Sequence, residues 1–183
     1  MTLTEPTASE LAEVIASARH GSPTALGMLY RWFAPDLLRM ATRLLASHAD
    51  AEDVVHDLFV GLPEHLARYD ERGQVRAWLR ATTVGMVRMR VRKETRRADV
   101  LAREVTARDP AAPQSMTHTD PAMSLDLEQA VNALPESLRL VFVLKQWEGY
   151  SHDEIATLLN ISAGAARVRH SRALDTLRSQ LER

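Results

Sequence analysis

Residues 148–177 read EGYSHDEIATLLNISAGAARVRHSRALDTL, a stretch that predicts two helices joined by a tight turn. Ser151 and Glu154 have the spacing of a capping box, in which each side chain accepts a hydrogen bond from the backbone N–H of the other, so a helix should begin there. Asn160 can adopt the left-handed backbone conformation of a tight turn, and Ser162 can cap the helix that follows. The stretch therefore predicts a helix-turn-helix unit.

The second predicted helix has an apolar face and a basic face. The residues that repeat at helical spacing and should face the core are Ala166, Ala173, Leu177 and Leu181. The residues on the outer side are Arg167, Val168, Ser171 and Arg172. Because arginine binds guanine edges or phosphates and serine can bond to either, this outer face suits the major groove of DNA. A helical hairpin with a solvated charged face is the simpler alternative.

The composition predicts an all-α protein. Alanine, leucine, arginine and glutamate dominate the 183 residues, whereas there are only 7 glycines and aromatic residues make up 5%. No apolar run reaches the length of a membrane span, and the first residues lack the basic and apolar parts of a signal peptide, so we expect a cytoplasmic protein without membrane insertion. The absence of cysteine excludes disulfides and thiolate metal sites.

The formal net charge of −1 hides a segregation of charge along the chain. Residues 1–73 carry eleven acidic residues against six arginines, residues 74–99 carry eight basic residues against two acidic ones, and residues 162–183 carry five arginines against two acidic residues. Two separated basic surfaces suggest two contacts with one long polyanion, since attraction to phosphates depends on clustered charge. Solvated helix faces remain the alternative for each surface.

A linker is expected between the two basic surfaces. Residues 100–123 contain three prolines among alanine, threonine, serine and aspartate, a composition that favours a flexible extended chain over a long helix. We therefore expect two small helical domains, at residues 1–99 and 124–183, joined by this linker.

Helix starts and faces can also be predicted in the first domain. Ser22 before Pro23 predicts one helix start, and Pro35 predicts another. Asp50 can cap a third helix that begins at the next residue. The apolar face of this third helix comprises Val55, Leu58, Phe59 and Leu62. Its opposite, acidic face comprises Asp53, His56, Asp57 and Val60, and such a face is usually only solvated.

A long basic helix is expected after the loop at residues 67–74. The residues predicted to share its apolar side are Val75, Leu79, Thr82, Met86 and Met89. The residues predicted to point elsewhere include Arg76, Arg80, Thr83 and Arg90. These arginines form the first of the two basic surfaces.

Two segments of the chain resemble conserved regions of bacterial RNA polymerase sigma factors. The run AEDVVHDLF at residues 51–59, followed by Trp78 and Leu79, is similar to their second region. The run from LPESLR at residues 134–139 through EIA at 154–156 to Arg172 and Ala173 is similar to their fourth region. The resemblance covers residues 22–99 and 124–182, and the direct joining of the two regions by a linker is typical of the extracytoplasmic-function (ECF) group. It implies a region 2-like helical bundle and a region 4-like helix-turn-helix domain.

The resemblance implies a role for the acidic face. In the family this face docks on the clamp helices of the largest polymerase subunit. The implied core-polymerase contacts are therefore Asp53, His56, Asp57 and Val60, with glutamine being usual where His56 stands.

The resemblance also implies that the basic helix and the loop before it melt the minus-ten promoter element and capture a flipped base. The residues implied are Tyr69, Arg76, Arg80, Gly85, Arg88 and Arg90. An unstacked strand requires an aromatic platform, here Tyr69, and a cationic track. Tyr69 and Trp78 could equally be core aromatics, and we favour the core for Trp78.

Two departures from the family pattern affect promoter recognition. Gly85 stands where an asparagine usually contributes to the flipped-base pocket. Glycine has no amide to read a base, and it costs about 1 kcal/mol in a helix relative to alanine, so we expect close packing or backbone approach to compensate.

The implied minus-thirty-five contacts are Ser162, Arg167, Val168, Ser171 and Arg172. Among these Val168 replaces a common serine, and Ala165 and Ala166 replace the commoner threonine and valine, so the upstream preference should be unusual.

The expected function is that of an alternative sigma factor that directs promoter recognition and opening without a cofactor. Its expected partners are core RNA polymerase, promoter DNA and an anti-sigma factor. The chain contains no His-Glu-x-x-His pair, phosphate-binding glycine loop or nucleophile elbow, so we expect no enzyme, no catalytic residue and no metal site. The alternative is a sigma-like decoy or adaptor that binds an anti-sigma factor without opening promoters, for which Gly85 is the best argument.

Overall fold

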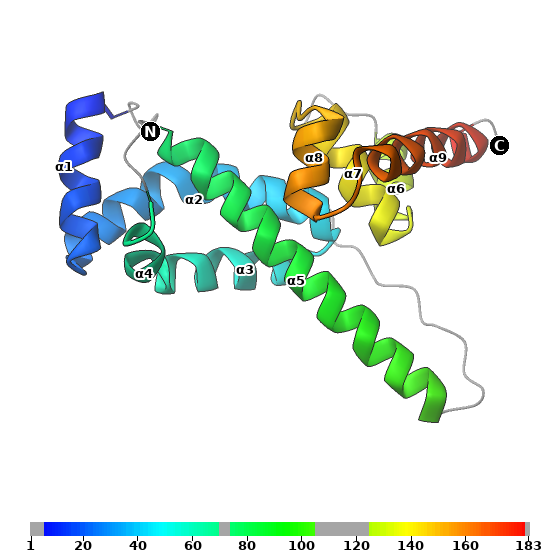
Figure 1. The fold of residues 1–183 in the computed structure, drawn as a ribbon, viewed down its shortest axis with the longest axis horizontal. Coiled ribbons are helices and arrows are strands. Elements are labelled where there is room, and N and C mark those ends of the chain that lie inside the picture. The colour runs from blue at the N-terminus through cyan, green and yellow to red at the C-terminus, as the bar shows by residue number, and fades with distance from the viewer. Residues whose placement is uncertain (1–5, 70–73, 105–124, 182–183) are drawn as a thin grey trace.

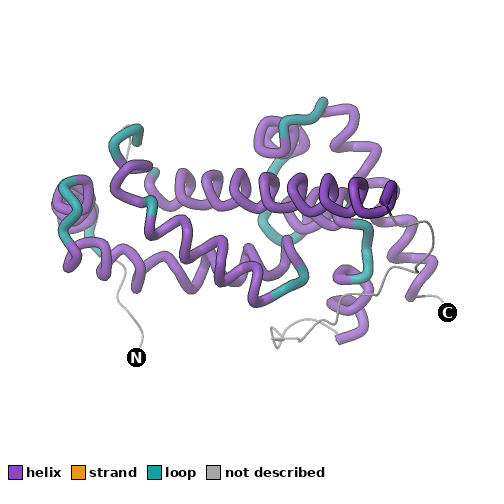
Figure 2. Tube along the Cα trace, turned by 90° about the horizontal axis from the view of Figure 1, so that it is seen from below, coloured by secondary structure: helices purple, strands orange, loops and turns teal. Residues whose placement is uncertain are grey.

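The computed structural model describes residues 6–69, 74–104 and 125–181, and every regular element within these ranges is an α-helix (Figures 1 and 2). The N-terminal group comprises α1 (Ala8–Arg19), α2 (Pro23–Leu45), α3 (His48–Val60), α4 (Leu62–Leu66) and α5 (Val75–Glu104). The C-terminal group comprises α6 (Leu125–Asn132), α7 (Glu136–Gln146), α8 (His152–Leu159) and α9 (Ala163–Leu181). The expected all-α fold with two helical domains is confirmed.

The central helix of the first domain is α2, which contacts α1, α3 and α5. It begins as predicted, because the Ser22 hydroxyl accepts a hydrogen bond from the Ala25 N–H at 3.4 Å and Pro23 occupies the first turn. The prediction that Pro35 starts a new helix is wrong, because Pro35 lies inside α2. Residues on both sides of Pro35 are buried against neighbouring helices, and this packing offsets the hydrogen bond that a proline removes.

The predicted start of α3 is also corrected. The cap is Ser47, whose hydroxyl accepts a hydrogen bond from the Asp50 N–H at 3.3 Å, and Asp50 lies in the first turn. The Asp50 carboxylate forms an ion pair with Arg90 of α5 instead of capping a helix. Helix α3 ends at Val60, and Pro63 lies in the first turn of α4, where a proline is tolerated.

The buried side of α5 differs in part from the predicted one. The buried residues are Val75, Leu79, Thr83, Val84 and Val87, whereas Met89 is 64% exposed and Thr82 and Met86 are only partly buried. A polar residue can be buried here because the Thr83 hydroxyl donates a hydrogen bond to the Leu79 carbonyl at 2.9 Å. Helix α5 runs to Glu104, which is inside the range expected to be linker, and residues 105–123 of that range lie outside the described residues.

The helix-turn-helix prediction is confirmed in its local details. The Ser151 N–H donates to the Glu154 carboxylate at 2.7 Å and the Glu154 N–H donates to the Ser151 hydroxyl at 3.2 Å, which completes the capping box. Asn160 has the left-handed values φ 53° and ψ 54°. The Ser162 hydroxyl accepts a hydrogen bond from the Ala165 N–H at 3.1 Å and so caps α9. Leu181, which was expected in the core, is half-exposed because α9 extends beyond the helices it packs on.

The two domains are in contact through two pairs of helices, α2 with α7 and α5 with α8. Arg139 of α7 is only 8% exposed, and its guanidinium donates to the carbonyls of Leu44 at 3.1 Å and Leu45 at 3.2 Å, at the C-terminal end of α2. It also donates within its own domain to the carbonyls of Asn132 at 3.1 Å and Leu134 at 3.2 Å. Arg139 therefore links the two domains through carbonyls that their own helices leave unpaired.

A histidine pair joins α8 to α9. His152 Nε2 lies 3.4 Å from His170 Nδ1, and Gln146 Nε2 lies 3.0 Å from His170 Nε2. Burial lowers the pKa of His170, and the nearby positive charges of His152 and Lys145 lower it further. The fold therefore favours neutral His170.

We expect the stability of the protein to fall as the pH drops below about 6.5, the ordinary pKa of histidine, because the unfolded chain binds a proton at His170 more readily than the folded chain does. The loss should level off below the lowered pKa of the folded state. Replacement His170→Gln removes the titrating group, so urea unfolding between about pH 7.5 and about pH 5.5 should show a weaker pH dependence for the variant. Equal pH dependence in the two proteins would contradict this assignment.

Candidate polymerase and promoter interfaces

The acidic face predicted on α3 is exposed. Asp53, His56 and Asp57 are all exposed, and Val60 beside them is 68% exposed. The opposite side of the helix is buried, which fixes the direction in which this face points. The structure thus brings all four predicted residues together on one accessible surface.

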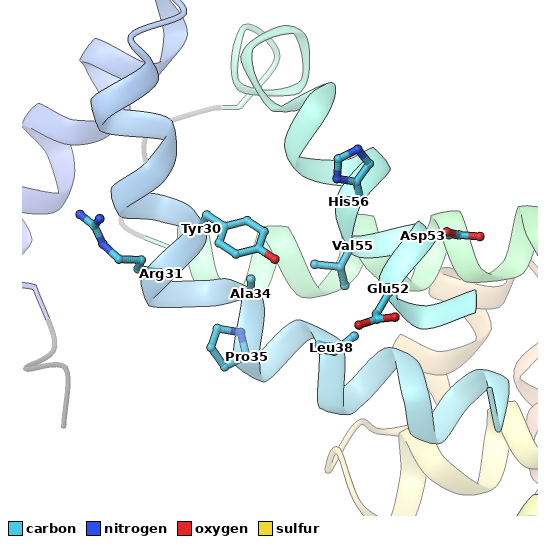
Figure 3. Close-up of a pocket in the computed structure, with 9 residues that line it drawn as sticks. All are labelled: Tyr30, Arg31, Ala34, Pro35, Leu38, Glu52, Asp53, Val55 and His56. Carbon is cyan, nitrogen blue, oxygen red and sulfur yellow. The ribbon is translucent and has the colours of Figure 1, made fainter. Parts of the chain in front are cut away.

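A groove of about 680 Å³ lies beside the acidic face, between α2 and α3. In Figure 3, Tyr30 extends from α2 toward Val55 on α3, whereas Arg31 points away from α3. The Tyr30 ring packs edge-on against Phe59 at 4.9 Å between ring centroids. The groove shares Asp53 and His56 with the acidic face, so the two features form one continuous surface. Sequence reasoning missed Tyr30, because helical periodicity places it beside a buried stripe and does not show that it is half-exposed.

Two arginines of the predicted cationic track on α5, Arg80 and Arg90, are paired with carboxylates. Arg80 binds Asp36 of α2 at 2.9 Å and also Glu148 of the C-terminal domain. Arg90 forms ion pairs with Asp50, with Asp53 at 3.3 Å and with Glu94 at 3.3 Å. These carboxylates neutralise the charges of Arg80 and Arg90. The sequence alone could not show this, because most of the partners lie more than thirty residues away.

The remaining predicted residues of this surface differ in exposure. Arg76 is exposed, with its guanidinium 5.5 Å from the centroid of the Phe33 ring, and Arg88 is partly buried with an Nε that has no hydrogen-bond partner. Tyr69 is only 7% exposed and packs against Trp78 with ring centroids 5.0 Å apart. A stacking platform must present a ring face to solvent, so the burial of Tyr69 favours the core alternative for this residue. Residues 70–73 of the preceding loop lie outside the described residues.

The packing expected to compensate for Gly85 is absent from the described structure. A β-carbon placed on Gly85 would meet no atom within 4 Å apart from its own helix backbone and chain neighbours. The residue lies inside α5 and is partly exposed, so neither a close approach nor a turn requires glycine.

Replacement Gly85→Ala should therefore raise the free energy of unfolding by about 1 kcal/mol, the difference in helix propensity between the two residues. Urea unfolding measures the effect. The matched control is Gly149→Ala, which also meets open space but has φ +77°, so this substitution should destabilise the protein. Destabilisation by Gly85→Ala would show that the position needs glycine after all.

The residues predicted to lie on the outer face of α9 are exposed in the structure. Arg167, Ser171 and Arg172 are exposed, and Val168 beside them is half-exposed. Ser162 is exposed at the start of the helix. Arg167 lies 3.8 Å from Asp153 of α8, a long contact between two well-exposed side chains that contributes little to stability. The face is therefore accessible to a large ligand.

Both domains match known families. Residues 29–97 match Sigma-70 region 2, and residues 124–177 match Sigma-70, region 4. No helix among the described residues has the length and apolar character needed to cross a membrane. The two helical domains are thus those of a sigma-70 type transcription initiation factor.

Individual relatives define the group. The chain is 30% identical to the RNA polymerase sigma factor CarQ of Myxococcus xanthus over 163 residues, which cover 89% of this chain and 92% of CarQ. It is 32% identical to the ECF RNA polymerase sigma factor SigE of Mycolicibacterium smegmatis over 84% of this chain and 60% of SigE. The structure of CnrH in complex with the cytosolic domain of CnrY superposes with a TM-score of 0.56 at 26% identity, covering 93% of this chain and 96% of that one. The chain belongs to the ECF family of RNA polymerase sigma factors, whose function is to direct promoter recognition in transcription initiation.

Proposed function

We propose that this sigma factor binds core RNA polymerase through the α3 face and its groove, and promoter DNA through α9 and α5. The observation that carries the proposal is the exposure of the predicted contact faces of α3 and α9 on domains that match sigma regions 2 and 4. The protein acts in the cytoplasm, where core polymerase acts. It needs neither a cofactor nor covalent chemistry. In vitro transcription with core enzyme tests the function, and a chain that binds core polymerase but never opens a promoter would favour the decoy alternative.

The polymerase surface combines negative charge with exposed apolar groups. Asp53 and Asp57 supply charge at its rim, and Val60 and the half-exposed Tyr30 supply apolar area. An interface of this kind uses complementary charge to orient the partner and apolar contacts to hold it. A polymerase helix with basic residues beside an aliphatic stripe fits both the face and the groove.

Replacement Asp57→Lys should weaken binding to core polymerase by about tenfold or more, because it turns an interfacial attraction into a repulsion. Asp57 is chosen because Asp53 also pairs with Arg90, so that changing Asp53 would disturb α5 as well. Fluorescence anisotropy of the labelled chain titrated with core polymerase gives the dissociation constant.

The control is Glu13→Lys, which makes the same change of charge at an exposed position on α1. Binding should be nearly unchanged in this control. Equal weakening by both substitutions would mean that overall charge, rather than the α3 face, determines affinity.

The minus-thirty-five element is bound by the outer face of α9. Arg167 lies in the second turn of the helix, where a side chain inserted into the major groove reaches base edges, whereas Arg172 lies more than one turn later. We assign Arg167 to a base and Arg172 to a phosphate. Val168 offers a methyl surface that suits the methyl group of thymine, and Ser162 and Ser171 can bond to phosphates.

Replacement Arg167→Ala should remove about 1 to 3 kcal/mol of discrimination at one base pair of the upstream element. Replacement Arg172→Ala should weaken binding to all sequences alike and reduce its dependence on salt. Duplexes selected by the wild-type holoenzyme from a randomised pool, and then varied one base pair at a time, provide the binding series. Unchanged affinity and specificity in both variants would exclude α9 as the reading helix.

The minus-ten element is bound by the basic side of α5, with the exposed Arg76 and the partly buried Arg88 and Arg90 among the contacts. Gly85 supplies no side chain to a flipped base, so discrimination at that base is weak or depends on neighbouring residues. An anti-sigma factor is the further expected partner, by analogy with the CnrH complex. It would act by covering one or both of these surfaces.

A further inference from the structure

One arginine of α5, Arg90, is bound to the acidic face of α3. Its guanidinium forms ion pairs with Asp50, in the first turn of α3, and with Asp53, where Nη2 lies 3.3 Å from Oδ2. Its Nε lies 3.3 Å from a carboxylate oxygen of Glu94 on its own helix. Asp53 is also one of the residues of the proposed polymerase surface. A side chain of α5 is therefore attached directly to that surface.

The exposure of these side chains shows which of them a partner can reach. The Arg90 side chain is 28% exposed, whereas that of Asp53 is 66% exposed. The contact with Arg90 uses Oδ2 of Asp53, and a carboxylate has about four acceptor positions on its two oxygens. Asp53 can therefore accept a hydrogen bond from a basic residue of a partner while Arg90 continues to hold it.

The charges around Arg90 leave this cluster acidic. One guanidinium faces the carboxylates of Asp50, Asp53 and Glu94, so negative charge is in excess. Asp50 and Asp53 are three residues apart on α3, where like charges repel each other, and the shared guanidinium offsets this repulsion. Burial acts to lower the pKa of Arg90, but the charges and hydrogen bonds of the two aspartates raise it overall. The cluster still suits a basic partner.

Holding Asp53 in one position favours the binding of such a partner. An exposed aspartate that moves between rotamers must be immobilised on binding, which reduces affinity, and an aspartate that is already held avoids this cost. Arginine is suited to holding two carboxylates, because its planar guanidinium directs N–H groups at both. The ammonium of lysine carries the same charge on a flexible chain and lacks this geometry.

We propose that Arg90 is a positioning residue of the polymerase surface: by holding Asp50 and Asp53 it keeps one end of the acidic face of α3 in the conformation that binds core polymerase. The inference rests on the proposed polymerase-binding role of this face. Arg90 acts through Asp53 and does not itself need to touch the polymerase. The role is exercised before any DNA is bound, so it is separate from the contact with the minus-ten strand.

Replacement Arg90→Lys isolates this role, because it keeps the net charge and removes the planar donor geometry. We expect it to weaken binding of the full chain to core polymerase by about three- to tenfold, measured by fluorescence anisotropy without DNA. The matched control is Arg92→Lys, which makes the same change at an exposed position on α5 and should leave the affinity nearly unchanged.

A double-mutant cycle separates positioning from a general effect on the packing of α3 against α5. In an Asp53→Asn background, Arg90→Lys should change the affinity for core polymerase by less than about twofold, since the carboxylate that Arg90 holds is gone. A purely structural role would weaken binding by the same factor in both backgrounds.

The inference is overturned if Arg90→Lys leaves the affinity unchanged, if Arg92→Lys weakens binding equally, or if the loss is the same with Asp53 and with Asn at that position. The Asp57→Lys experiment tests the proposed function separately. Weaker binding of Asp57→Lys with an unchanged Arg90→Lys variant would refute the positioning role alone. Unchanged binding of Asp57→Lys would refute the polymerase role of the α3 face, and the positioning role with it.

Discussion

The arrangement of the molecule depends on one buried guanidinium, that of Arg139. A helix leaves its last carbonyls without partners, and α2 ends inside the protein, where water cannot supply them. Arg139 satisfies Leu44 and Leu45 from the opposite domain. Loss of a partner for a buried carbonyl costs about 1 to 3 kcal/mol, so this contact fixes where α7 can lie on α2. The positions of α8 and α9 follow from it, because both pack on α7.

Two of the arginines on α5 are neutralised by carboxylates that other helices supply. Sequence alone suggests a strongly basic α5 facing a polyanion, but carboxylates from α2, α3 and the C-terminal domain pair with Arg80 and Arg90. The acidic N-terminal residues and the basic stretch after residue 74 therefore neutralise one another in space as well as in the total. At these two positions the folded protein presents less positive charge to its surroundings than the sequence implies.

The features that the sequence predicted correctly depend on residues within about four positions of one another. The capping box of Ser151, the left-handed turn at Asn160 and the start of α2 at Ser22 are all local. The errors arose where packing overrides local preference. Pro35 is tolerated because both sides of it are buried, and Tyr69 is buried by Trp78, which follows it by nine residues. An arginine within the apolar run LRLVFVL at residues 138–144 was the available signal for a buried polar contact, but its two partners in the other domain are 94 and 95 residues away.

Helix α5 is one continuous element of 30 residues, which corresponds to a length of about 45 Å. Its first half belongs to the core of the N-terminal domain, and its last turns project beyond both domains (Figure 1). The C-terminal end of α5 therefore lies far from the surface on which α7 and α8 pack. The C-terminal domain is held where it lies by the contacts of α7 with α2 and of α8 with α5, so packing, and not the point at which α5 ends, sets its position.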